Sequence, residues 1–165
     1  APRPDILVTG DGKHLALVEP DGRVSLLRAA AGDYTRDLLL ENAGTKTEPT
    51  PIETWPGASC SPDICIIEIE RGDDRWRILA TRSPFRVPAL EMAAACKRVD
   101  IVVSDRWLPK SCNPRLLKAD RNMLDVSGGL AFYLSSGRIR SVNAENPNMP
   151  WKKAARTAKE QAANP

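Results

Sequence analysis

Short apolar runs bounded by turn residues recur along the chain and predict β-strands. Tight turns such as Pro20-Asp21-Gly22 and Arg71-Gly72-Asp73-Asp74 join several of these runs into hairpins. The Val/Ile run near residue 102 lacks polar alternation, which is typical of a buried central strand. The predicted strands are Ile6–Val8, Leu15–Val18, Val24–Leu27, Cys65–Glu70, Trp76–Ala80, Asp100–Ser104, Leu130–Leu134 and Arg138–Val142.

Three further segments have helical character. Asp33–Ala43 contains three consecutive leucines, with Asp33 suited to the N-cap and Gly44 to the C-terminal end. Ala89–Lys97 is rich in small residues that can pack closely on a sheet, and Leu116–Leu124 predicts a third, short helix. Strand hairpins with helices between them predict an α/β layered domain.

Two segments fall outside this pattern of strands and helices. Thr45–Pro62 is rich in proline and has little periodicity, so a long loop is predicted there, and loops of that length are often functional or mobile. After Trp151 the composition shifts to Lys, Ala, Arg and Gln. The folded domain is therefore expected to span residues 5–151, followed by a flexible basic and Ala-rich tail over residues 152–165.

The overall composition is that of one globular domain. The chain has 165 residues, of which 42% are hydrophobic and 27% charged, and its formal net charge is +3. A mildly basic balance allows contact with nucleic acid or an anionic surface without requiring it. No apolar run approaches the roughly 20 residues that span a bilayer.

The chemistry-bearing residues give little support to an enzyme. The only histidine, His14, excludes His-rich metal sites; it lies near Asp11 as a possible general base, but a histidine in such a turn more often caps it. Gly10-Asp11-Gly12 lacks the remaining residues of a phosphate-binding loop. No serine occupies a nucleophile elbow, and no Cys-x₂-Cys knuckle occurs. No catalytic residue, metal ligand set or cofactor is predicted.

The four cysteines have two main interpretations, and a structural Cys₄ zinc site is a third, disfavoured by the absence of a Cys-x₂-Cys knuckle. They are either buried free thiols or two disulfides formed in an oxidising compartment, and four cysteines allow three connectivities. The local pairing is favoured because each pair brackets turn-forming residues. It joins Cys60 to Cys65 and Cys96 to Cys112.

Basic residues concentrate in one part of the chain. Between Lys97 and Arg121 there are seven cations and three acidic residues, an excess of four positive charges, with Trp107 among them. Clustered cations can contact phosphates and an aromatic ring can stack on a base, although a solvated basic surface has the same composition. The cations are Lys97, Arg98, Arg106, Lys110, Arg115, Lys118 and Arg121.

The order of these motifs resembles that of a known family. The matching segments are Leu7–Lys13, Leu15–Val18, Pro20–Gly22, Ser25–Leu27, Cys65–Ile69, Ile78–Arg82, Val99–Trp107 and Gly129–Val142, with Trp151 after them. In this order they resemble the C-terminal domain of ComEC-family competence proteins, the inner-membrane channels for DNA uptake in natural transformation. The Cys-Ser-Pro-Asp-x-Cys, Ala-Thr-Arg-Ser and Val-Val-Ser-Asp-Arg segments are similar to those of a shorter, alphaproteobacterial type. The resemblance implies a truncated metallo-β-lactamase-like fold.

The chain departs from that family at its metal ligands. The His-x-His-x-Asp-His segment of the family would fall within Thr45–Ser59, which contains no histidine. Arg82 stands at the bridging aspartate, Arg106-Trp107 replaces the late histidine pair, and Lys13 replaces the aspartate after the second turn glycine. The resemblance therefore implies a non-catalytic accessory domain, whose partners are incoming DNA and the membrane channel portion of the same protein.

The resemblance also implies a place and a binding surface. The domain is expected at the bacterial inner membrane, on the periplasmic side, where disulfides stay oxidised. Lys13, Arg82 and Arg106 are expected to line the former metal cleft as a phosphate-binding groove, unless the two arginines pair with Asp100 or Asp105 to brace the sheet. Lys110, Arg115 and Lys118 are further candidate phosphate contacts. A purely structural module packing on the channel and a residual nuclease are the alternatives.

Overall fold

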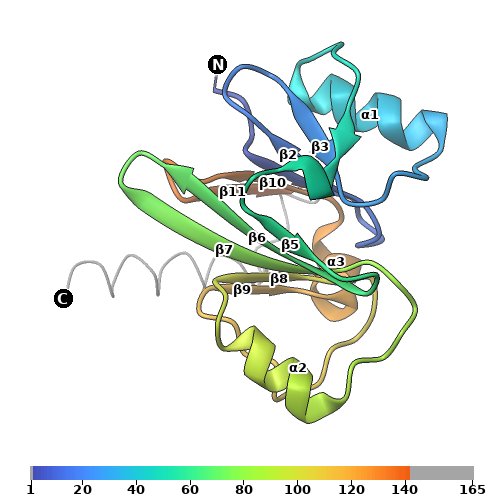
Figure 1. Cartoon of the computed structure of the whole chain (residues 1–165), viewed down its shortest axis with the longest axis vertical. Coiled ribbons are helices and arrows are strands. Elements are labelled where there is room, and N and C mark those ends of the chain that lie inside the picture. Colours follow the sequence, from blue (N-terminus) through green and yellow to red (C-terminus); the bar gives the residue numbers. More distant parts are fainter. Residues whose placement is uncertain (1, 142–165) are drawn as a thin grey trace.

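Two β-sheets packed face to face form the centre of the molecule, with a helix on each outer side (Figure 1). The structure is a computed structural model, and it describes residues 2–141. Helix α1 (Asp33–Ala43) covers the outer face of the first sheet, and α2 (Ala89–Cys96) covers that of the second. The prediction of a layered α/β domain is confirmed in this sense: the chain forms two mixed sheets and three short helices.

The first sheet is antiparallel except at one edge. Its six strands run in the order β11-β10-β1-β2-β3-β4, and only β3 and β4 pair in parallel. The strands are β1 (Ile6–Val8), β2 (Leu15–Val18), β3 (Val24–Leu26), β4 (Thr50–Pro51), β10 (Leu130–Tyr133) and β11 (Arg138–Ser141).

The second sheet is half antiparallel and half parallel. Its order is β5-β6-β7-β8-β9; β5, β6 and β7 are antiparallel, whereas β7, β8 and β9 run parallel. Helix α2 is the crossover between β7 and β8, as parallel neighbours require. The strands are β5 (Ala58–Cys60), β6 (Ile64–Arg71), β7 (Asp74–Thr81), β8 (Ile101–Val103) and β9 (Leu117–Ala119). The buried central strand expected near residue 102 is β8.

Alternation along each strand separates three apolar clusters. On β1, Ile6 and Val8 face the space between the sheets, whereas Leu7 faces α1. On β7, Ile78 lies in the same central core, and Leu79 packs towards α2. Because successive strand residues point to opposite faces, each strand contributes both to the inner core and to the contact with one outer helix.

The predicted helix Leu116–Leu124 is wrong. The segment instead forms strand β9 and then α3 (Arg121–Ser127), with Asp120 between them as the N-cap. The Asp120 carboxylate accepts the Met123 backbone N–H at 3.3 Å, and Leu117 and Ala119 both face the central core. A helix through this segment would put Asp120 in a helix interior, where its side chain competes for backbone hydrogen bonds.

The predicted loop Thr45–Pro62 is also wrong in part, because it contains β4, the 3₁₀ turn η1 (Ile52–Thr54) and β5. Ile52 is fully buried, and the Trp55 indole N–H donates to the Glu68 carbonyl at 3.2 Å. None of these elements exceeds three residues, which is too short to show periodicity. At α1, the N-cap position is occupied by Gly32 rather than Asp33.

All four cysteines lie in two close pairs, and none is free. Cys60 and Cys65 face each other across β5 and β6, with Cα atoms 4.1 Å apart. Cys96, at the end of α2, pairs with Cys112 in the segment between β8 and β9, with a Cα separation of 5.2 Å. The structure thus has the local pairing rather than four separate thiols.

Two other predictions concern residues near and beyond the end of the described chain. The tail over residues 152–165 and the position of Trp151 lie outside the described residues, as does Val142 of the last predicted strand. Within residues 2–141, no helix has the length and apolar character needed to cross a bilayer.

Candidate functional site

The candidate site is the edge of the molecule where strands β7 and β8 end. The two strands are parallel neighbours, so their carboxyl ends meet at the same side of the sheet. The buried Thr81 hydroxyl donates to the buried Ser104 hydroxyl at 2.8 Å and links the two ends. Of the residues predicted to line a cleft, Arg82 directly follows Thr81 and Arg106 lies two residues after Ser104. We call this region the strand-end edge.

Arg82 connects three segments at the strand-end edge. Its Nη1 is hydrogen-bonded to the Glu53 carboxylate and lies 3.5 Å from the Leu27 carbonyl oxygen. Its Nε donates to the Ser61 carbonyl at 3.2 Å. The hydrogen bond from Arg82 lowers the pKa of Glu53 below its usual value of 4.5, so this carboxylate remains charged near neutral pH. The pair fastens η1 to the end of β7.

Arg106 holds a neighbouring loop in place. Its Nη1 donates to the Phe85 carbonyl at 2.6 Å, and its Nη2 donates to the Ser83 carbonyl. Its Nε lies 3.7 Å from the Asp105 carboxylate. Charge-assisted bonds of this kind are stronger than neutral ones, so Arg106 fixes residues 83–85 against the end of β8.

Arg28 joins the β1–β2 turn to the same network, although no sequence pattern predicted it. Its Nε donates to the Lys13 carbonyl at 2.6 Å, and its Nη2 lies 3.8 Å from the Asp105 carboxylate. Gly12 in that turn has a φ of +73°, and a Cβ there would lie 2.4 Å from the Ser104 carbonyl oxygen. The turn is therefore seated directly on the end of β8.

Hydrogen bonds inside the β1–β2 turn order Asp11 and His14. Asp11 accepts from the Thr9 hydroxyl at 2.6 Å and from the Lys13 backbone N–H at 3.0 Å. Burial is the largest single influence on the pKa of Asp11 and raises it, but these two bonds together with the charges of His14 and Lys13 make the net pKa lower than usual. Burial is also the main influence on His14, whose pKa falls below 6.5 despite the opposing effect of Asp11. His14 is therefore mostly neutral at neutral pH.

Opposite charges nearly balance at the strand-end edge. The four cations Lys13, Arg28, Arg82 and Arg106 lie among the three carboxylates Asp11, Glu53 and Asp105. Both predicted arginines retain some exposure, with side chains 18% exposed for Arg82 and 21% for Arg106. Within residues 2–141, no three His, Cys, Asp or Glu side chains come together in a metal-binding arrangement.

The other predicted phosphate contacts are more dispersed. Lys110 is exposed in the segment after β8, and Lys118 lies on β9 with its Nζ 3.3 Å from the Pro109 carbonyl oxygen. Arg115 precedes β9 and contacts Asp100 at 3.4 Å, before the start of β8. Because β8 and β9 are parallel, Arg115 lies at the opposite end of the sheet from Arg106. The structure therefore brings Lys13, Arg82 and Arg106 to one edge but leaves Arg115 away from it.

Two members of the network were missed by sequence reasoning. Arg28 directly follows the third predicted strand, and this position after a strand end could have marked it as a candidate site residue. Glu53 had no such signal, because it lies in a 3₁₀ turn of three residues within the proline-rich segment. Of the two proposed brace partners, Asp105 lies beside Arg106, whereas Asp100 contacts Arg115 and accepts the Arg77 backbone N–H.

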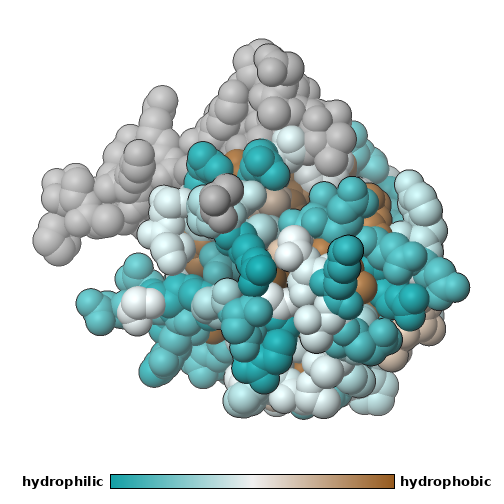
Figure 2. Space-filling view, turned by 90° about the horizontal axis from the view of Figure 1, so that it is seen from above, coloured by the Kyte–Doolittle hydropathy of each residue, from teal (hydrophilic) through white to brown (hydrophobic). Residues whose placement is uncertain are grey.

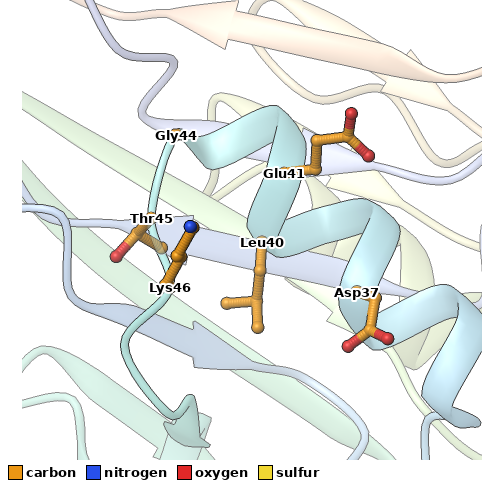
Figure 3. Close-up of a pocket in the computed structure, with 6 residues that line it drawn as sticks. All are labelled: Asp37, Leu40, Glu41, Gly44, Thr45 and Lys46. Carbon is orange, nitrogen blue, oxygen red and sulfur yellow. The ribbon is translucent and has the colours of Figure 1, made fainter.

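A separate pocket of about 670 Å³ lies between α1 and the segment that follows it (Figure 3). Leu40 and Lys46 approach it from opposite sides, and Asp37 and Glu41 project from the helix in different directions. The view of the molecule from above is mainly hydrophilic, with apolar surface in small separate patches (Figure 2). The α1 pocket has no convergent set of polar groups comparable to the strand-end edge.

Comparison with known proteins gives no further assignment: no family model matches the chain, and no curated protein or solved structure shows significant similarity to it.

Proposed function

We propose that this chain is a non-catalytic accessory domain of a ComEC-type DNA-uptake channel in natural transformation, and that it contacts DNA through phosphates. The motif order across residues 5–151 supports the proposal. Two packed sheets with helices on both outer sides form a layered arrangement that is compatible with a truncated metallo-β-lactamase-like fold.

One observation carries the proposal. In the family resemblance Arg82 and Arg106 replace metal ligands, and in the structure both are bound to carboxylates or carbonyl groups of the strand-end edge. Fixed positive charges thus occupy the region where the family would bind cations. The nearby carboxylates Glu53 and Asp105 already pair with arginines, so they do not offer a divalent ion a free set of ligands, and these residues favour a non-catalytic role.

Phosphate contact is assigned to the cations that remain accessible. Lys13 and Lys110 are exposed, and the structure gives neither ammonium group an ion pair or hydrogen bond within residues 2–141. The partly exposed guanidinium groups of Arg82 and Arg106 add positive potential beside Lys13. Lys118, on β9, and Arg115, which pairs with Asp100 at the opposite end of the sheet, lie farther away. Ammonium and guanidinium groups bind phosphate oxygens by charge-assisted hydrogen bonds.

The proposed location is the periplasmic side of the inner membrane, next to the channel portion of the same protein. Both cysteine pairs are compatible with an oxidising, extracytoplasmic compartment. The strand-end edge would then face incoming DNA before it enters the channel.

A DNA-binding titration tests the proposal directly. Fluorescence anisotropy of the purified chain with labelled single- and double-stranded oligonucleotides is expected to show binding that weakens steeply with salt. The Lys13→Gln, Lys110→Gln variant should bind more weakly and with a shallower salt slope, while Lys46→Gln, on the α1 side, serves as the matched control.

Two outcomes would contradict the proposal. Absence of binding to either form of DNA at low salt would reject DNA contact and favour the purely structural alternative. Cleavage of DNA stimulated by manganese or zinc, together with stoichiometric metal in the purified protein, would reject the non-catalytic assignment.

A further inference from the structure

A groove of about 420 Å³ lies on the second sheet's side of the molecule, next to the strand-end edge. It runs between the segment before α2 and the segment after β8. Its apolar lining includes the buried Met92, and both exposed cationic and aromatic side chains stand at its rim. Arg86, Val87 and Met92 line one side, and Arg106 to Pro109 line the other. The Arg106 guanidinium reaches across to the Phe85 carbonyl. We call this the Trp107 groove.

Three interactions fix the walls of the Trp107 groove. Arg106 binds the Phe85 carbonyl and so ties one wall to the other. The buried Asp120 accepts the Leu108 backbone N–H at 3.2 Å while it caps α3. The Cys96–Cys112 pair connects α2 to the second wall. The groove is therefore preformed, and a ligand would bind without first ordering these segments.

Trp107 is the most unusual feature of the groove because a large ring is left in water. Its side chain is 66% exposed, and the Arg121 guanidinium lies 5.1 Å from the ring centroid. Phe85, whose carbonyl is bound by Arg106, is 55% exposed. Exposed aromatic rings beside arginines are a common arrangement for stacking unpaired bases.

The charges around the rings favour an anionic ligand. Arg86 lines the groove, Arg121 lies over the Trp107 ring, and Lys110 directly follows Pro109 in the chain. All three are exposed, and of the three only Arg121 has an ion pair among the described residues, with Asp125 at 3.3 Å. An uncharged apolar partner would gain nothing from these cations. A polyanion with flat aromatic groups is complementary to both features of the surface.

We propose that the Trp107 groove binds single-stranded DNA, with bases stacking on Trp107 and phosphates contacting Arg86, Lys110 and Arg121. This inference rests on the proposed function, since it names the form of DNA that the domain contacts. In a duplex the base faces are already stacked on one another and cannot reach an exposed ring. A single strand exposes them, so the groove selects single-stranded over double-stranded DNA.

Substitutions at the exposed aromatic residues test this selection. Binding of a labelled oligothymidylate strand and of a labelled duplex is measured by anisotropy for the wild-type chain and for Trp107→Ala, Trp107→Phe and Tyr34→Ala. Tyr34 is a matched control because it is 81% exposed but lies on α1. We expect Trp107→Ala to weaken single-strand binding by about tenfold, Trp107→Phe to restore much of it, and Tyr34→Ala to have no effect.

The possible failures are distinguishable. If neither form of DNA binds, the proposed function fails. If DNA binds but the duplex binds at least as tightly, or Trp107→Ala leaves single-strand affinity unchanged, only the groove assignment is overturned. Trp107-dependent binding to anionic lipid vesicles without single-strand binding would likewise overturn it. Because Trp107 is exposed, its variants should keep the wild-type unfolding temperature, which calorimetry checks.

Discussion

The Thr81 hydroxyl donates a hydrogen bond to the Ser104 hydroxyl at 2.8 Å, and both side chains are buried at the ends of adjacent parallel strands. The Ser104 hydroxyl also accepts the Arg106 backbone N–H at 3.3 Å. This hydrogen bond continues the contact between β7 and β8 beyond their backbone pairing, just before Arg82 and Arg106. The geometry of the strand-end edge therefore depends on two side chains that carry no charge.

Thr81→Val and Ser104→Ala are expected to destabilise the fold by about 1–2 kcal/mol each, because each leaves a buried hydroxyl or N–H without its partner. The double variant should lose less than the sum of the two, since the second change removes an already unpaired group. Urea unfolding of the four proteins gives the coupling energy. Strict additivity would mean that the hydrogen bond does not contribute to stability.

Arg106→Gln is expected to lower the free energy of unfolding by about 1–3 kcal/mol, because two carbonyl groups lose charged donors. Arg23→Gln is the matched control. The Arg23 side chain is 69% exposed and pairs only with nearby acids on the surface, so its loss should be barely measurable. Equal effects of the two substitutions on denaturant unfolding would contradict an anchoring role for Arg106.

Gly12→Ala should be far more destabilising than Gly137→Ala. Both glycines have φ near +70°, so both substitutions incur the left-handed backbone cost of about 1 kcal/mol. At Gly12 the new Cβ would also lie 2.4 Å from the Ser104 carbonyl oxygen, whereas nothing lies within 4 Å at Gly137. The difference between the melting temperatures of the two variants measures the effect of the close contact with Ser104. Similar melting temperatures would show that the turn does not lie against the end of β8.

The titration of His14 gives a direct test of the β1–β2 turn, because the chain has only one histidine. Burial lowers the folded-state pKa below 6.5, so the unfolded chain binds the proton more readily. Protonation of His14 therefore leaves the free energy of unfolding unchanged above pH 6.5 and lowers it as the pH falls below that value.

NMR of the imidazole protons should give a midpoint below 6.5 for the folded protein. Removing the nearby negative charge by Asp11→Asn should lower the midpoint further, and Arg28→Gln should raise it, because these side chains act on His14 in opposite directions. A midpoint at or above 6.5 in the wild-type protein would contradict the burial of His14.

Titration of the denatured, unreduced protein with a thiol reagent is expected to find no free sulfhydryl group, since all four cysteines are paired. Loss of the Cys96–Cys112 pair in a double serine variant should cost about 3 kcal/mol, compared with about 2 kcal/mol for Cys60–Cys65, because the sequence separations are 16 and 5. Four reactive thiols would reject both pairs.

Strand hairpins were the part of the fold that sequence patterns predicted well. The alternation of Cys65–Glu70 and the return at Trp76–Ala80 both lie within β6 and β7, which extend by one or two residues at their ends. Strand β6 buries every second residue, so its side chains show the period of two. Strand β7 is mostly exposed in its first half and buried on both faces from Ile78 to Thr81. The short strands β4 and β5 were missed because neither contains a buried residue, whereas β1 and β8, equally short or nearly so, are fully buried apolar runs.

The candidate site was predictable only where residues follow strand ends. Arg82 and Arg106 were expected together because the family resemblance brings their two strand ends to one cleft, and the structure shows these strands as parallel neighbours. The partners of the two arginines could not be named. Glu53 reaches Arg82 from a segment 29 residues away, and Arg106 binds carbonyl groups, which every residue has. Such contacts depend on tertiary placement that sequence patterns do not encode.

The Cys96–Cys112 pair also sets a mechanical limit on the molecule. Strand β8, Arg106 and Trp107 all lie within the covalent ring that this pair closes. If a force pulls on Trp107 and the hydrogen bonds of β8 break, the segment can extend only as far as the closed loop between Cys96 and Cys112 allows. Tension on this segment is therefore carried through a covalent link to α2, and the segment is protected from complete extension.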